Sequence, residues 1–246
     1  ANAVSDIYLT DTEGSLMINT VTSLGGAVAL NALELELGVI TADKTATLNV
    51  LGAITNKEST ETNVTATDIL INADSVGAVG NAITTDLVGG SLTVDAVNDV
   101  VIHDVQGEVN VERIISANGN VVLKTEDALN LNKIEAVNGK VTLDVNGDLV
   151  NVAENDEINV IAKELTAEVK GTVGATDKHL VTKVELMDMG AKQDIYLSCV
   201  SESVTITNLT AENGEIVLEA GNGENGTTVI ENASANSITI TATNAT

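Results

Sequence analysis

The 246-residue sequence contains no proline, phenylalanine or tryptophan, and only two tyrosines, one cysteine and one arginine. Carbohydrate platforms, base-stacking surfaces and protein-binding hot spots rely on aromatic and arginine side chains, so the composition disfavours all three. The single cysteine, Cys199, excludes an internal disulfide and a cysteine-based metal cluster. We expect Cys199 at an exposed strand end, with an intermolecular crosslink as the alternative to a structural role.

Basic residues are also scarce, because 11 lysines and arginines face 36 acidic residues and give a net charge of −25. Such a chain repels nucleic acid and anionic membranes, so neither is predicted as a partner. The acidity is typical of a solvated surface, and calcium binding is the alternative. No EF-hand loop or glycine-aspartate nonapeptide is present, so no metal ligand and no cofactor is predicted.

Long apolar runs are missing as well, and no stretch approaches the 18 residues of a membrane span. The sequence begins ANAVSD, without methionine, a basic region or an apolar leader. We therefore expect no membrane insertion, and either a processed mature chain or part of a longer one.

What the sequence does contain is a repeat. Residues 6–30 align without a gap with residues 99–123 and 194–218, at offsets of 93 and 95. The positions that are aliphatic in all three copies are, in the first copy, Ile7, Leu9, Leu16, Ile18, Val21, Val28 and Leu30. Two further positions recur as Gly26, Gly119 and Gly214 and as Asp6, Asp99 and Asp194, which is typical of turns and strand starts. The sequence therefore predicts one continuous domain, 1–246, with internal units of about 94 residues at 1–93, 94–188 and 189–246.

A second match links the units, GAVG at 77–80 with GTVG at 171–174. In this alignment, segment 175–180 corresponds to the shorter segment 81–83. The alignment predicts connectors of unequal length.

A shorter period of about 20 residues lies inside each unit: GAVAL at 26–30 is followed by ATLNV at 46–50. The alternating stretches are three to five residues long, which favours short strands and leaves no long helix. One coil cannot bury its inward row alone, whereas stacked coils bury aliphatic columns worth about 1.5 to 3 kcal/mol per side chain. The prediction is an all-β parallel β-helix of about a dozen coils.

The strings DIYL, GSLMI and GGAVAL, repeated as DIYLS, ESVTI and NGEIVL and joined by GAVGN and GTVGA, resemble the repeat region of filamentous-haemagglutinin-type bacterial surface adhesins. The resemblance implies a right-handed β-helix, export by two-partner secretion, and an extracellular or cell-surface location. Two features depart from that pattern: the connector proline is missing, and no N-terminal secretion domain is present. Export by this route is thus implied for a longer parent chain.

The candidate catalytic residues are better explained as turn residues than as a catalytic site. Asp99 and Asp104 could pair as a general acid and base, but Asp6 with Asp11 repeats the spacing and Asp194 with Cys199 breaks it. The two histidines, His103 in a slot that also holds Thr10 and Ser198, and His179 in a connector, have no serine or cysteine partner at a recognisable spacing. No catalytic residue is predicted.

The remaining candidates are surface residues. Tyr8 and Tyr196 share one slot, adjacent to inward aliphatic residues, and should face outward to pack or to make a lateral contact. Asparagine sequons would carry glycans if the source glycosylates exported proteins. They begin at Asn63, Asn208, Asn225, Asn232 and Asn244.

These features together favour a non-enzymatic, extracellular β-helical rod that is part of an adhesin or of a self-associating filament. Its expected partners are a further copy end to end or more of its own chain, and a host or neighbouring cell surface. A surface-layer or sheath subunit is one alternative. The other is a polysaccharide-degrading β-helix, which would cluster acids, basic residues and aromatics on one outer sheet.

Overall fold

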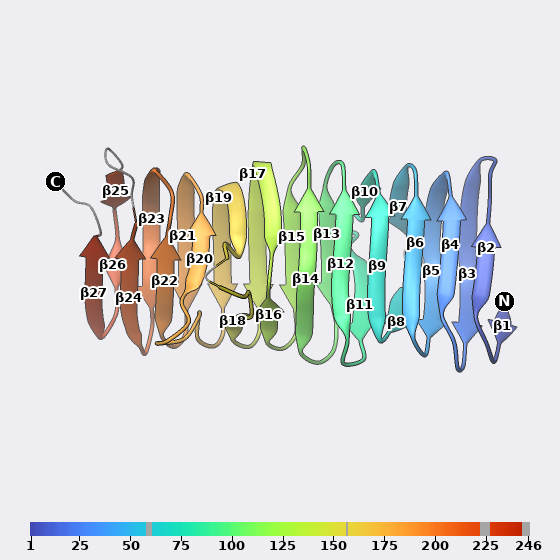
Figure 1. The fold of residues 1–246 in the computed structure, drawn as a ribbon, viewed down its shortest axis with the longest axis horizontal. Coiled ribbons are helices and arrows are strands. Elements are labelled where there is room, and N and C mark those ends of the chain that lie inside the picture. The colour runs from blue at the N-terminus through green and yellow to red at the C-terminus, as the bar shows by residue number, and fades with distance from the viewer. Residues whose placement is uncertain (58–60, 156, 222–226, 243–246) are drawn as a thin grey trace.

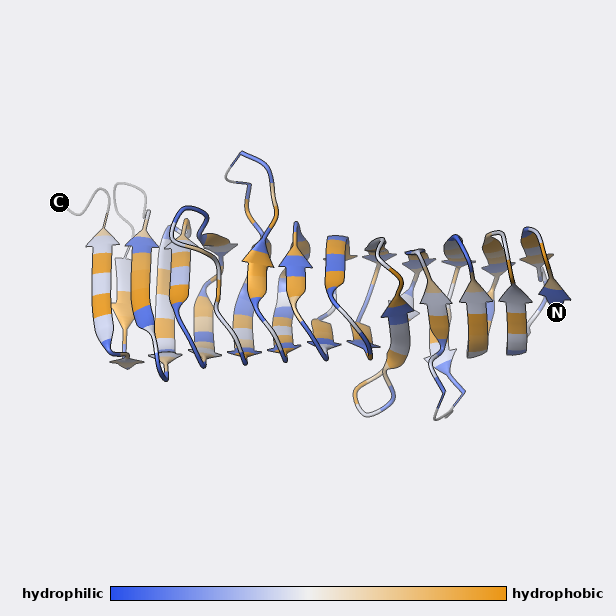
Figure 2. Ribbon diagram, turned by 90° about the horizontal axis from the view of Figure 1, so that it is seen from below, coloured by the Kyte–Doolittle hydropathy of each residue, from blue (hydrophilic) through white to orange (hydrophobic). Residues whose placement is uncertain are grey.

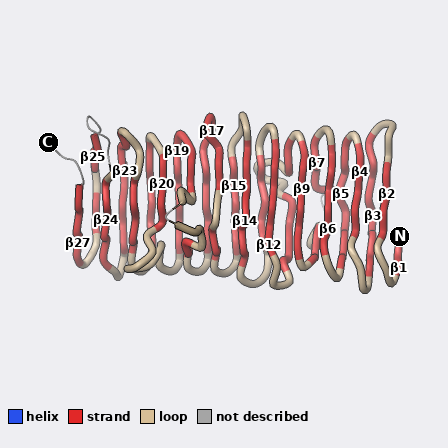
Figure 3. Tube along the Cα trace, in the orientation of Figure 1, coloured by secondary structure: helices blue, strands red, loops and turns tan. Residues whose placement is uncertain are grey.

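The computed structural model describes residues 1–57, 61–155, 157–221 and 227–242. These residues form a parallel β-solenoid of about 11 turns, about 21 residues apart, without a helix (Figures 1 and 3). The predicted fold class is confirmed, and the turn length agrees with the predicted coil of about 20 residues.

Each turn contributes strands to two opposite faces of the solenoid. The strands of one face run in the opposite direction to those of the other (Figure 1). Face 1 contains β2 (Ile7–Thr10), β4 (Val28–Ala32), β6 (Thr45–Val50), β9 (Asp68–Ala73), β12 (Ser91–Ala96), β14 (Val109–Ser116), β16 (Leu129–Leu131), β18 (Leu149–Asn151), β20 (Leu180–Lys183), β22 (Ile195–Cys199), β24 (Glu215–Ala220) and β27 (Ser237–Ala242).

Face 2 contains β1 (Asn2–Ala3), β3 (Ser15–Ser23), β5 (Glu34–Ala42), β7 (Ala53–Asn56), β8 (Val64–Ala66), β10 (Ser75–Val76), β11 (Ile83–Leu87), β13 (Val100–Asp104), β15 (Val121–Thr125), β21 (Leu186–Ala191), β23 (Ser203–Ala211), β25 (Thr227–Ile230) and β26 (Ala233–Ser234). Two long strands, β17 (Ile134–Val145) and β19 (Val160–Val169), pair with face 1 at their beginnings and with face 2 afterwards.

The core is a set of aliphatic columns between the two faces. In β4, Val28, Leu30 and Ala32 are buried and alternate with half-buried or exposed residues. The register stacks Val28 on Ala46 and Leu30 on Leu48 of β6, so inward residues of successive turns lie in contact. Because the side-chain period is two, the alternation read from the sequence defines which residues enter the core.

Successive copies of the long repeat begin on opposite faces of the solenoid. An offset of 95 residues at about 21 per turn is about 4.5 turns, so the copies beginning at residues 6 and 194 start on face 1 with β2 and β22. The copy beginning at residue 99 starts on face 2 with β13. A recurring β-bulge supports the equivalence: register shifts occur between Leu92 and Thr93 of β12 and between Met187 and Asp188 of β21. Each half-turn of strand and corner is therefore the structural unit.

Loops follow the same exchange. In the N-terminal half the chain leaves face 2 between β7 and β8 and between β10 and β11. In the C-terminal half it leaves face 1 between β18 and β19 and again at residues 174–179, before β20. Figure 2 shows the described parts of these loops projecting from opposite sides of the rod.

The connectors correct the sequence alignment. Gly77 and Gly174 are equivalent: both have positive φ, 65° and 66°, and their N–H groups donate to Ile54 O and Leu149 O at 2.8 Å. A Cβ at Gly77 would strike backbone atoms of the adjacent turn, so only glycine fits. Isolated bridges close both connectors, which run over 77–83 and 174–180 with equal length. The prediction of unequal connectors was wrong, because GTVG had been matched three residues too early.

Candidate functional site

The recurring aspartates lock the corners between turns. Asp99 Oδ1 accepts a hydrogen bond from Asn120 N at 2.7 Å, and Asp194 Oδ1 accepts one from Glu215 N at 2.7 Å. The glycine before each donor allows this approach, since a Cβ on Gly119 would lie 2.6 Å from Asp99 Oδ1. The interpretation of these residues as turn residues is confirmed.

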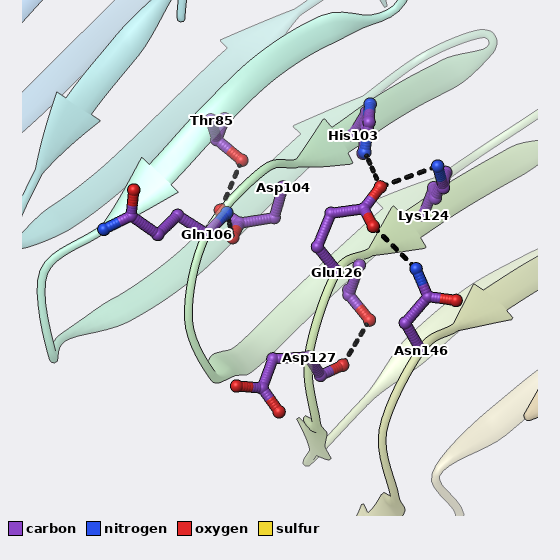
Figure 4. Close-up of polar contacts among 9 residues, drawn as sticks. Thr85, His103, Asp104, Gln106, Lys124, Glu126, Asp127 and Asn146 are labelled. Carbon is purple, nitrogen blue, oxygen red and sulfur yellow. Dashed lines mark hydrogen bonds and ion pairs between the residues drawn. The ribbon is translucent and has the colours of Figure 1, made fainter. Parts of the chain in front are cut away.

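Asp104 differs from Asp99, because its side chain lies in the core. It is fully buried in an inward column between Thr85 and Thr125, and its Oδ2 accepts a hydrogen bond from Thr85 Oγ1 at 2.8 Å (Figure 4). Burial raises the pKa of Asp104 from 3.8 to about 6 despite this hydrogen bond. Asp99 is exposed at the corner, so the two carboxylates do not share a site.

The equivalent position in the C-terminal half is Cys199, which contacts Thr182 Oγ1 through Sγ at 3.5 Å. The cysteine is fully buried, so the expectation of an exposed thiol was wrong. The end of β22 pairs with β20 and β24 and turns its last side chain into the core. Burial raises the pKa of the Cys199 thiol to about 11, which disfavours the thiolate that a crosslink would need.

A charged cluster around Glu126 lies on the outer side of face 2. Glu126 Oε1 contacts Lys124 Nζ at 2.6 Å and His103 Nε2 at 2.7 Å, and Glu126 Oε2 accepts a hydrogen bond from Asn146 Nδ2 at 2.6 Å (Figure 4). Lys124, and then His103, lower the pKa of Glu126 to about 2. The strand pairing brings these residues together, since His103 lies beside Lys124 in adjacent turns.

This cluster has the residue types for an amide crosslink between a lysine and an asparagine, which would release ammonia. That reaction requires an uncharged amine. The hydrogen bond to Glu126 raises the pKa of Lys124, and Glu126 itself is held ionised. The contacts therefore form an ion-pair network that connects three turns.

The 174–180 connector contains the second histidine. His179 lines a pocket of about 330 Å³ together with Ser198 and Glu219, a grouping that the sequence spacing did not reveal. Its Nδ1 is buried, makes no hydrogen bond among the described residues, and lies 3.7 Å from Glu219 Oε2. This separation is within ion-pair distance but longer than a direct hydrogen bond.

The two tyrosines have different environments. Tyr8 is exposed, whereas Tyr196 is buried on the outer side of face 1, with its ring 6.1 Å from that of His179 and its hydroxyl donating to Glu215 Oε1 at 2.9 Å. The connector thus covers Tyr196, one of the two tyrosines that the sequence predicted to face outward. Tyr196 packs, as the prediction allowed, but within the chain.

Two fully buried asparagines, Asn63 and Asn159, each make several hydrogen bonds through the side-chain amide. Asn63 Nδ2 donates to Leu37 O, Gly38 O and Asn56 Oδ1, at 3.1, 3.0 and 3.1 Å. Asn159 Nδ2 makes the equivalent set, with Leu131 O, Asn132 O and Asn151 Oδ1 at 2.9, 3.1 and 2.8 Å. We call these two networks the asparagine clamps. They close the core where the chain leaves the solenoid.

The asparagines of the predicted glycosylation sequons therefore differ in their exposure to solvent. Asn63 is fully buried, and the hydrogen bonds of its amide leave no room for a glycan in the folded chain. Asn208 and Asn232 are exposed, and donate to Asp188 Oδ2 at 3.2 Å and to Thr207 O at 3.0 Å. Asn225 and Asn244 lie outside the described residues.

No group of three or more potential metal-binding side chains occurs among the described residues. Within the same part of the chain, no helix is present that is long and apolar enough to cross a membrane. Comparisons with family models, with curated proteins and with solved structures gave no match for this chain.

Proposed function

We propose that this chain is a segment of an extracellular structural rod that acts in adhesion or in a filament. The observation that carries the proposal is the continuous ladder of about 11 turns around one aliphatic core. Parallel pairing of every turn with its neighbours gives stiffness along the axis without disulfides. The sequence resemblance to surface-adhesin repeats supports the same role.

The last described turn supports an extension of the rod. In β24, Ile216 and Leu218 are buried, but their partners in β27, Ile238 and Ile240, are 42% and 49% exposed. A further coil, from the same chain or from a second copy, would cover these side chains and pair with the free edge of β27.

Sedimentation velocity over a range of concentrations tests self-association. We expect elongated species that grow with concentration and that are lost in the double variant Ile238→Lys and Ile240→Lys. The matched control is the double variant Val79→Lys and Val88→Lys, at two exposed valines next to β11, which adds the same two charges. A monomer at every concentration would contradict end-to-end association and leave a longer chain as the source of the next coil. Cleavage of acidic or neutral glycans by the purified chain would instead favour the polysaccharide-degrading alternative.

A further inference from the structure

A groove runs along the axis at the edge where face 1 turns into face 2. Its volume is about 560 Å³, and its floor consists of small inward-leaning residues, Ala32, Val50 and Ala73. One wall is formed by the residues that follow the strand ends of successive turns, Leu33, Leu51, Asp74 and Val97. Its three apolar members, Leu33, Leu51 and Val97, which we call the apolar ridge, are 36%, 80% and 46% exposed.

The opposite wall is a ladder of amides. Asn49 Nδ2 donates to Asn31 Oδ1 at 3.1 Å, and Asn72 Nδ2 donates to Asn49 Oδ1 at 2.9 Å. The ladder holds these side chains parallel to the axis, so the groove has a fixed polar side and a fixed apolar side.

The apolar ridge is not required by the fold. The half-turn repeat places Glu126, Asn146 and Lys192 at the positions equivalent to Leu33, Leu51 and Val97, on the same backbone. Since the solenoid accepts charged and polar side chains there, exposed leucines in the N-terminal half indicate a surface that another molecule covers.

The charges around the groove select the occupant. The described lining residues include Asp11, Asp74 and Asp95 and no lysine or arginine. Arg113 neutralises Asp95, at 3.0 Å from Nε to Oδ1, so Asp11 and Asp74 supply the negative potential on a chain of net charge −25. Five turns at about 4.8 Å span about 20 Å, which matches about six residues of an extended peptide.

We infer that this groove binds an extended cationic peptide segment that presents aliphatic side chains to the ridge of Leu33, Leu51 and Val97 and lysine or arginine to Asp11 and Asp74. Backbone amides of such a segment lie within reach of the asparagine ladder. The groove is too short to hold a stable dimer by itself, since specific interfaces bury about 800 Å² per partner.

The test uses an eight-residue peptide of alternating lysine and valine with a terminal tryptophan, whose fluorescence is read without background because the chain has no tryptophan. The test variant combines Leu33→Glu, Leu51→Asn and Val97→Lys, which copies the equivalent edge and leaves the net charge unchanged. The control is Val79→Asn, an 87% exposed valine in a loop of face 2. Circular dichroism of both variants should match the parent chain.

We expect the triple variant to weaken peptide binding at least tenfold, and Val79→Asn to leave the Kd unchanged. Undetectable binding, equal binding to both variants, or equal binding of a glutamate and valine peptide would overturn the inference. Sedimentation of the chain alone distinguishes the remaining occupant: a dimer that disappears in the triple variant would assign the groove to a second copy instead.

Discussion

The two halves of this rod have nearly the same backbone and different surfaces. The edge of face 1 exposes Leu33 and Leu51 beside Asp74, and the equivalent edge of face 2 carries Glu126 and Asn146 in an ion-pair network. Both edges follow strands with the same inward pattern, and the same bulge occurs in both halves. The comparison shows that corners and inward columns constrain the fold, whereas outward side chains are free to carry function.

The same comparison exposes two kinds of buried polar residue. The asparagine clamps recur in both halves, with Asn63 and Asn159 in matching networks. The inward position near a strand end also recurs, but its residue differs: it is Asp104 in one half and Cys199 in the other. The clamps satisfy backbone groups that the departing loop leaves open, so both halves need them.

The largest effect is expected from the clamps. Asn63→Ala would remove the donor to Gly38 O and the acceptor of Thr84 N. Asn159→Ala would likewise remove the donor to Asn132 O and the acceptor of Val181 N. At about 1 to 3 kcal/mol for each such group, both should lower the free energy of unfolding by about 3 kcal/mol or more in urea titrations. The exposed Asn208→Ala is the control, with an expected change within about 0.5 kcal/mol. If only one clamp variant is destabilised, the two networks are not equivalent.

The second-largest effect is a pH dependence of the free energy of unfolding, which we expect from Asp104 and not from Cys199. The folded chain binds more protons at Asp104 than the unfolded chain between pH 3.8 and about 6, so its contribution to stability falls as the pH rises through this window. The cost is complete above pH 6 and corresponds to about 3 kcal/mol for a shift of about two units.

Asp104→Cys, which copies the residue of the other half, should remove this dependence. In denaturant titrations from pH 4 to 7, we expect the free energy of unfolding of Asp104→Cys, relative to the parent chain, to increase as the pH rises. Asp99→Asn serves as the control at an exposed carboxylate. If the difference in the free energy of unfolding between Asp104→Cys and the parent chain does not vary with pH, the burial argument is contradicted.

The smallest effect is expected at the charged edge. Exposed ion pairs contribute about 0 to 1 kcal/mol, so Glu126→Gln should change the melting temperature only slightly, and less at high salt. Because the pKa of Glu126 is lowered, any stabilisation is present above pH 4.5 and is lost as the pH falls toward 2. A large loss of stability at neutral pH would show that this edge supports the fold after all.

Much of the architecture follows from local patterns. The aliphatic alternation predicted the strands, the short period predicted the stacking, and the Asp and Gly positions predicted the corners. What local patterns could not supply was the register at the connectors, where Gly174 and not Gly171 has the left-handed backbone of Gly77. Sequence identity alone could not choose between two glycines three residues apart, since the choice depends on contacts with the next turn.

The candidate surfaces were less predictable. Nothing near Asn63 in the sequence marks it as buried, because its hydrogen-bond partners lie 25 and 26 residues away. Cys199 and His179 depend likewise on partners about one or two turns away, at Thr182 and Glu219. A search at the turn spacing of about 21 residues would have found His103 beside Lys124 and Ser198 beside Glu219.

By itself the sequence determined that this chain folds as stacked coils, because side-chain alternation and recurring turn residues are local properties that every coil repeats. Only the tertiary structure decided which face each repeat occupies, which polar side chains enter the core and which edge carries the apolar groove. These features depend on the number of residues per half-turn summed over several turns, and one added residue in a bulge or loop shifts every later contact.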